Sequence, residues 1–163
     1  MKKTICAVLL AIGLVSCTAQ KENISPEALS EKLLSVTLEP TELKKILKKH
    51  EGKPILIEVW ASWCGDCVKA MPLLKETQAK FPDVAYVFVS MDKTPEKWKE
   101  GITKHSLVGD HYFAPDGMKG SFGKAINVDW IPRYMILDKK GKVVVYRAIE
   151  KDFDMINSTL EKL

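Results

Sequence analysis

Apolar positions along the chain follow two spacings. Near-continuous apolar runs at 54–61 and 84–91 predict strands that are covered on both faces. Two shorter runs at 133–137 and 143–147, joined by a turn at 138–141, predict an antiparallel pair. Apolar residues that recur every three or four positions predict helices, and these stretches are 26–35, 41–51, 68–80, 95–105 and 153–162.

The remaining segments are less regular. A brief edge strand is expected at 36–38, and residues 106–129, which contain four glycines and a proline, are expected to form a loop with a helix within 118–126. Strand–helix–strand followed by strand–strand–helix predicts an α/β fold. It would have a mixed central sheet of four to five strands, with helices on both faces.

The first residues resemble an export signal. Lys2 and Lys3 precede an apolar stretch at 5–15 that is too short to span a bilayer. Leu14-Val15-Ser16-Cys17 resembles the bacterial lipobox, which implies cleavage before Cys17 and its lipidation. An ordinary signal peptide with an incidental cysteine is the alternative. The expected organisation is a lipoprotein signal at 1–16, a flexible tether at 17–25 and one domain at 26–163.

Charge and motifs exclude several functions. The chain has 25 basic and 21 acidic residues, a net charge of +4, and lysines alternate with glutamates along the predicted helices. This pattern is typical of a solvated surface and not of a nucleic-acid interface. Phosphate-binding glycine motifs and paired metal-ligand motifs are absent, so we expect neither cofactor nor resident metal.

Two of the four cysteines point to redox chemistry. Cys6 would leave with the signal and Cys17 would carry lipid, which leaves Cys64 and Cys67 as the intramolecular pair. They follow a buried strand and begin a helix, where free amides and the helix dipole favour a thiolate. A purely structural disulfide is the alternative, although a bridge across so short a loop stabilises little.

The segment from Ile55 to Cys67, with Trp60-Ala61-Ser62-Trp63-Cys64-Gly65-Asp66-Cys67 at its end, resembles the active-site segment of thioredoxin-like proteins. Pro72, five residues later, and the stretch Trp130-Ile131-Pro132-Arg133 before the final hairpin also match. The resemblance covers roughly residues 36–163. It implies a thioredoxin-like fold, and similarity to TlpA/ResA-type lipoproteins implies a thiol–disulfide oxidoreductase.

The resemblance assigns roles to the cysteines and their neighbours. Cys64 would be the nucleophile and Cys67 the resolving thiol, while Gly65 and Asp66 would tune the redox potential. A carboxylate beside the sulfurs opposes the thiolate and favours an electron donor, unless Asp66 instead points into water and pairs with Lys69. Glu58 is expected to be a buried acid that exchanges a proton with Cys67; a solvated carboxylate at the sheet edge is the alternative.

The same resemblance places substrate-binding residues beside the pair. Pro132 would be a cis-proline that leaves the backbone of Ile131 free to pair with an extended peptide. Arg133 would favour an acidic or thiolate partner, or would simply be exposed. Trp63 would flank the site, and Trp60 would either flank it or pack in the core.

The expected function is therefore reduction of disulfides in envelope proteins by a monomer that is lipid-anchored on the periplasmic side. Its partners would be protein disulfides, a membrane thiol donor and the bilayer, with no nucleic acid. An oxidase or isomerase is the first alternative. A Sco-like copper chaperone is a further alternative, although its cysteines are separated by three residues and Cys64 and Cys67 by two. A redox-inactive binding module is the other rival outside the enzyme class.

Overall fold

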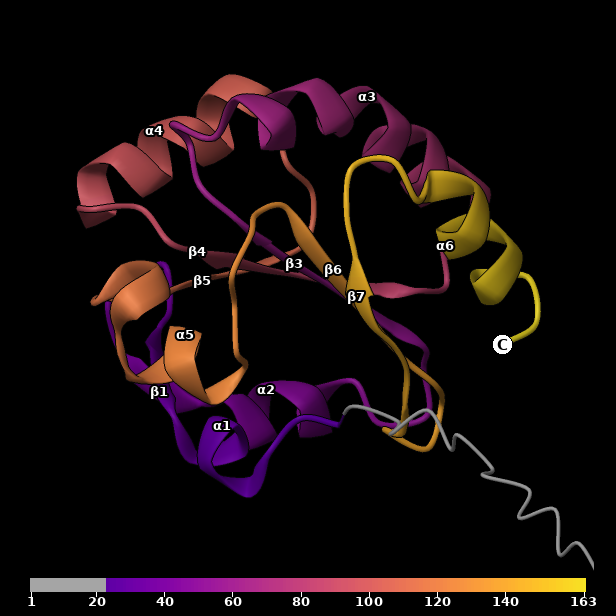
Figure 1. Cartoon of the computed structure of the whole chain (residues 1–163), viewed down its shortest axis with the longest axis horizontal. Helices are drawn as coiled ribbons and strands as arrows, with labels where there is room; N and C mark the ends of the chain where they lie inside the picture. Colours follow the sequence, from indigo (N-terminus) through magenta and orange to yellow (C-terminus); the bar gives the residue numbers. More distant parts are fainter. Residues whose placement is uncertain (1–22) are drawn as a thin grey trace, which may run out of the picture.

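A mixed seven-stranded sheet lies between two layers of helices (Figure 1). The computed structural model describes residues 23–163. The expected signal segment at 1–16, Cys17 and most of the tether therefore lie outside the described residues. The fold class agrees with the sequence-based prediction.

The strands are short at the edge formed by the N-terminal hairpin and longer in the centre. They are β1 Lys32–Leu34, β2 Pro40–Glu42, β3 Ile55–Trp60, β4 Ala85–Ser90, β5 Asp110–Phe113, β6 Arg133–Leu137 and β7 Val143–Ala148. Their order across the sheet is β2-β1-β5-β4-β3-β6-β7. The β3–β4 and β4–β5 pairs are parallel, and the other pairs are antiparallel.

Helices cover both faces of this sheet (Figure 1). They are α1 Pro26–Ser30, α2 Leu43–Lys49, α3 Gly65–Lys80, α4 Pro95–His105, α5 Ser121–Ala125 and α6 Phe153–Leu160, with a 3₁₀ turn at Gly117–Lys119. Helices α3, α4 and α6 lie on one face, and α1, α2 and α5 lie on the other. None of the helices within 23–163 combines the length and the hydrophobicity needed to cross a bilayer.

The two central strands explain why their sequences are nearly continuous in apolar residues. Every residue of β3 and of β4 is buried, because helices cover both faces of the sheet and strands flank both edges of each. Pro72 lies inside α3, as expected. Thr94 caps α4, with its side chain accepting a hydrogen bond from the Lys97 amide.

The predicted number of strands was wrong, because the sheet has seven and not four to five. Three of the strands, β1, β2 and β5, have only three or four residues, too few to show an alternating pattern. Their stability comes from pairing with neighbours: β1 pairs with both β2 and β5, and β5 pairs in parallel with β4.

The N-terminal elements also differ from the prediction. The first helix, expected to run to residue 35, ends at Ser30. Leu33 and Leu34 lie in β1 instead, where Leu33 is fully buried. The segment expected as a strand at 36–38 forms the turn between β1 and β2, in which Leu38 has φ 65°. Tertiary pairing of Leu33 with Thr41 has overridden the helical spacing.

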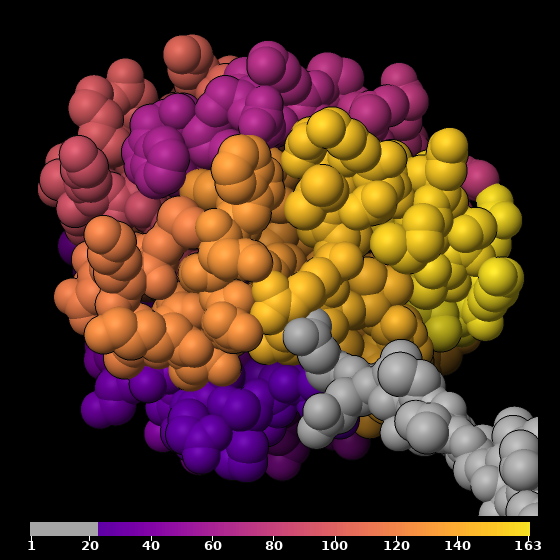
Figure 2. Space-filling model, viewed as in Figure 1, coloured from indigo at the N-terminus to yellow at the C-terminus, as the bar shows by residue number. Residues whose placement is uncertain are grey.

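Residues 106–129 form ordered structure where the prediction gave mainly a loop. They contain β5, the 3₁₀ turn and α5, so the helix expected within 118–126 is present in a shorter form. Figure 2 shows this orange segment on the surface, between the indigo N-terminal elements and the magenta α3. The segment leads directly into the residues that border the cysteine pair.

Candidate active site

Cys64 and Cys67 form a disulfide at the beginning of α3, with their Cα atoms 5.3 Å apart. Cys64 is the N-cap of the helix, and its sulfur accepts a hydrogen bond from the Cys67 amide at 3.1 Å. In the reduced form the same amide and the positive end of the helix would stabilise a thiolate at Cys64. Cys67 is completely buried, whereas Cys64 retains a small exposed surface of 6%.

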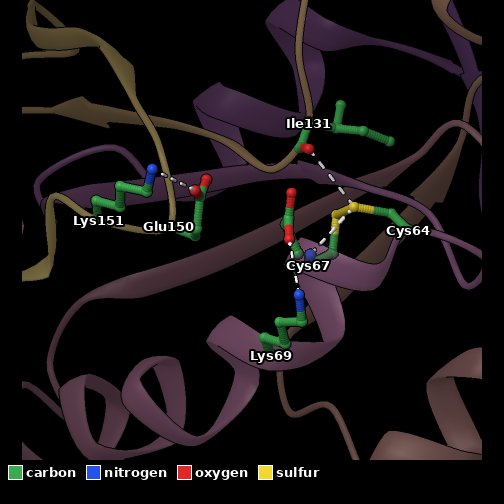
Figure 3. A network of polar contacts seen from close by, with 7 residues as sticks. Cys64, Cys67, Lys69, Ile131, Glu150 and Lys151 are labelled. Carbon is green, nitrogen blue, oxygen red and sulfur yellow. Dashed lines mark hydrogen bonds and ion pairs between the residues drawn. A yellow bond between two sulfur atoms is a disulfide. The ribbon is translucent and has the colours of Figure 1, made fainter.

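The loop before β6 forms the wall that faces the disulfide. The Ile131–Pro132 peptide bond is cis, as predicted. The carbonyl oxygen of Ile131 lies 3.5 Å from the Cys64 sulfur (Figure 3). That sulfur carries no hydrogen while it is in the disulfide, so the contact becomes a hydrogen bond only with the reduced thiol.

A surface pocket of about 370 Å³ opens beside Cys64. Trp63 and Trp130, which are 56% and 50% exposed, line it together with Met118. Trp60, in contrast, is fully buried in the core, so the alternative that it packs there is correct. Large exposed apolar side chains next to a reactive sulfur are suited to contact another protein.

Comparisons with known proteins agree with this geometry. Residues 52–143 match the family model described as thioredoxin-like, which is more than half of the chain. The chain belongs to the thioredoxin-like family. It is 30% identical to the thiol-disulfide oxidoreductase ResA of Bacillus anthracis over 126 residues, which cover 74% of this chain and 69% of that protein.

Solved structures of thioredoxin-like proteins have the same architecture. A candidate thiol-disulfide oxidoreductase from Bacteroides vulgatus is 30% identical, with a TM-score of 0.66 over 88% of this chain and 93% of its own. A thiol-disulfide oxidoreductase from Bacteroides fragilis has a TM-score of 0.70 at 22% identity, over 84% of this chain and 99% of its own, and at that identity supports the fold alone.

Glu58 is buried in the middle of β3, with 1% of its surface exposed, so it is not a solvated carboxylate at the sheet edge. Strand alternation places it on the same face as Trp60, whose ring reaches Gly101 of α4. This is the face that α3 covers, with Cys67 in its first turn (Figure 1). Burial raises the pKa of the Glu58 carboxyl to about 8, and a hydrogen bond from the Tyr134 hydroxyl opposes the rise.

Asp92 supports the loop before the cysteines, a role that the sequence analysis did not assign. Its buried carboxylate accepts hydrogen bonds from the Ser62 amide at 3.1 Å, from the Ser62 hydroxyl at 2.7 Å and from the Ser90 hydroxyl at 2.8 Å. These bonds fix the segment between β3 and Cys64. A carboxylate directly after the near-continuous apolar run at 84–91 was the available signal in the sequence.

Arg133 does not lie where a substrate could reach it. Its side chain is 2% exposed, and Nη2 donates to Asp129 in the loop before the cis-proline. Arg147 also pairs with Asp129, at 3.3 Å. Both expectations for Arg133, contact with a partner and simple exposure, therefore differ from the structure. The Arg133 guanidinium can be buried because Asp129 supplies the opposite charge, and this ion pair joins β6 to the loop before the cis-proline.

The residues expected to tune the pair lie in the first turn of α3. Gly65 is its first residue, and no atom lies within 4 Å of a Cβ placed there. Asp66 lies next, with its carboxylate 3.4 Å from the Lys69 ammonium group. This is the pairing with Lys69 that the sequence analysis gave as the alternative. Lys69 is largely exposed, so this ion pair contributes little to stability.

Histidines lie apart from the cysteine pair. His50 contacts the Asp110 carboxylate at 2.9 Å, and His111 stacks on Phe88 with ring centroids 4.8 Å apart. Across residues 23–163, no three histidine, cysteine or acidic side chains are grouped as a metal site would require.

Replacing Glu58 by Gln should change how stability depends on pH. Between pH 4.5 and about 8 the unfolded chain loses the Glu58 proton while the folded protein keeps it, so the wild-type free energy of unfolding falls as pH rises. Glu58→Gln removes this decline. Urea unfolding should show similar stabilities at pH 4 and a variant more stable by on the order of 5 kcal/mol at pH 8.5.

The same substitution at Glu76, which is exposed on α3, controls for the loss of a charge. A difference between Glu58→Gln and wild type that is equal at both pH values would contradict a raised pKa at this position.

Proposed function

We propose that this protein reduces disulfide bonds of other proteins outside the cytoplasm by dithiol exchange through Cys64 and Cys67. It is a thiol–disulfide oxidoreductase by its cysteine pair and by its relatives. The observation that carries the proposal is the Cys67 amide, which donates to the Cys64 sulfur at the beginning of α3. That arrangement makes Cys64 the better leaving group and the better nucleophile of the pair.

The reaction begins with the reduced pair. The Cys64 thiolate attacks one sulfur of the substrate disulfide, and the other substrate sulfur leaves as a thiolate that takes a proton. Glu58 then accepts the proton of Cys67, and the Cys67 thiolate attacks the Cys64 sulfur. The Cys64–Cys67 disulfide forms, the second substrate thiolate leaves, and two electrons have passed to the substrate.

The surroundings of the pair support binding of an extended peptide. The loop at Ile131 faces the Cys64 sulfur, and the pocket with Trp63 and Trp130 lies beside it. A substrate chain that pairs with the backbone of this loop would bring its own disulfide to Cys64. The aromatic side chains would contact the residues that flank the substrate cysteine.

The two cysteines should give opposite results when each is replaced by serine. Cys67→Ser retains the nucleophile but cannot resolve the mixed disulfide, so covalent complexes with substrates should accumulate on non-reducing gels. Cys64→Ser should form none, and its rate of insulin reduction should fall to the uncatalysed background. Undiminished capture of partners by Cys64→Ser would indicate a redox-inactive binding module instead.

The direction of electron flow is tested by the reduction potential. Equilibration of the Cys64–Cys67 pair with a thiol buffer should give a value near that of thioredoxin, about −270 mV. A value near about −120 mV would instead make the protein an oxidant. If no disulfide equilibrates, copper titration with a mass readout tests the Sco-like alternative.

The proposed location rests on the sequence before the described residues. Cleavage before Cys17 and its acylation would anchor the domain to a bacterial membrane on the periplasmic side, within reach of a membrane thiol donor. The chain would act as a monomer. Cys17→Ser should move the protein from the membrane fraction to the soluble periplasmic fraction, with activity retained. Persistent membrane attachment of the variant would contradict lipidation at this residue.

A further inference from the structure

Tyr134 holds the buried carboxyl of Glu58 from the neighbouring strand. The two residues are direct partners in the β3–β6 register. Tyr134 is fully buried, and its hydroxyl donates to Oε1 of Glu58 at 3.2 Å. Phe153 of α6 packs edge-on against its ring, with centroids 5.3 Å apart and planes at 69°. The ring is therefore fixed by packing, and its hydroxyl is fixed on the carboxyl.

The two oxygens of Glu58 have different surroundings. Oε1 accepts the bond from Tyr134, whereas Oε2 is buried without a hydrogen-bond partner among the described residues. A buried oxygen without a partner is costly. While the disulfide is intact, Cys67 has no hydrogen to donate. Reduction gives Cys67 a thiol on the face of the sheet that Glu58 occupies, so Oε2 is the oxygen left open for proton exchange.

We propose that Tyr134 is a positioning residue for thiol–disulfide exchange: its hydroxyl fixes Glu58 through Oε1 and leaves Oε2 to take the proton of Cys67. The hydrogen bond also favours the charged carboxylate over the neutral acid. It thereby lowers the pKa of the buried Glu58 carboxyl, so that more of it is deprotonated and able to accept a proton. This inference rests on the role proposed above for Glu58.

The ionisable groups near Glu58 and Tyr134 come from α3, from β6 and from the segment after β7. Cys67 lies in the first turn of α3, on the side of the sheet that α3 covers, and Tyr134 belongs to β6. Glu150, in the segment after β7, acts electrostatically on Tyr134 and lies 4.0 Å from Lys151 (Figure 3). Phe88, the β4 neighbour of Glu58, and Phe153 do not ionise. Burial, followed by the two nearby carboxylates, raises the pKa of Tyr134, so the phenol keeps its proton and remains a donor.

The test is Tyr134→Phe, which retains the ring and removes only the hydroxyl. Carbon-13 NMR of the glutamate carboxyls should show the wild-type Glu58 titrating at a pH of about 8. In Tyr134→Phe it should titrate about one pH unit higher. Resolution of a preformed Cys64 mixed disulfide by Cys67 should slow about tenfold at pH 7, and its pH profile should move upward by the same interval.

Tyr86→Phe is the matched control. Its hydroxyl donates to the carbonyl oxygens of Thr77 and Phe81, at the other end of α3 from the cysteines. This variant should leave both the Glu58 titration and the resolution profile unchanged. Uniform replacement of tyrosine by 3-fluorotyrosine, a stronger donor, gives a second measurement that should move the Glu58 titration downward, and it serves if Tyr134→Phe does not fold.

The outcomes separate the two proposals. An unchanged Glu58 titration in Tyr134→Phe, or no downward movement with 3-fluorotyrosine, overturns the role of Tyr134. If Glu58→Gln slows resolution while Tyr134→Phe leaves its pH profile in place, only the Tyr134 inference fails. If Glu58→Gln does not slow resolution at all, the proton-transfer role of Glu58 itself fails, whatever Tyr134 does to its titration.

Discussion

The position of β3 between β4 and β6 is the constraint on which the site depends. Its parallel pairing with β4 places Trp60 opposite Ser90, so that Asp92, two residues later, can bind the Ser62 segment. Its antiparallel pairing with β6 brings Val59 opposite Arg133, directly after the cis-proline. Both sides of the disulfide are thus positioned by one strand, which ends at Trp60, four residues before Cys64.

Two different environments act on the two cysteines. Cys64 lies at the N-terminus of α3, next to an amide donor and a surface pocket, where negative charge is stabilised. Cys67 is one turn further in, fully buried, on the face of the sheet occupied by Glu58. Burial opposes charge on both Cys67 and Glu58. The proposed transfer of one proton between them would avoid placing two charges in the core.

The chemistry of the site was largely readable from the sequence, and its support was not. The cysteine spacing predicted the disulfide, and the resemblance to thioredoxin-like proteins predicted the cis bond at Pro132. Arg133 was misplaced because a charged residue gives no local sign of being buried against Asp129, four residues earlier. Tyr134 looked like one of several apolar strand residues, since its bond to Glu58 joins positions 76 residues apart.

The sequence by itself determined the long elements and the reactive pair. β3, β4, α3 and α4 have enough residues for their burial pattern to show, and the cysteines need only their place at a strand–helix boundary. The tertiary structure decided the short strands β1, β2 and β5 and the partners of Glu58, Asp92 and Arg133. The physical reason is that a strand of three or four residues is too short to show a burial pattern and is stabilised by the strands it pairs with. A buried polar group likewise depends on hydrogen-bond and ion-pair partners that only the folded chain brings together.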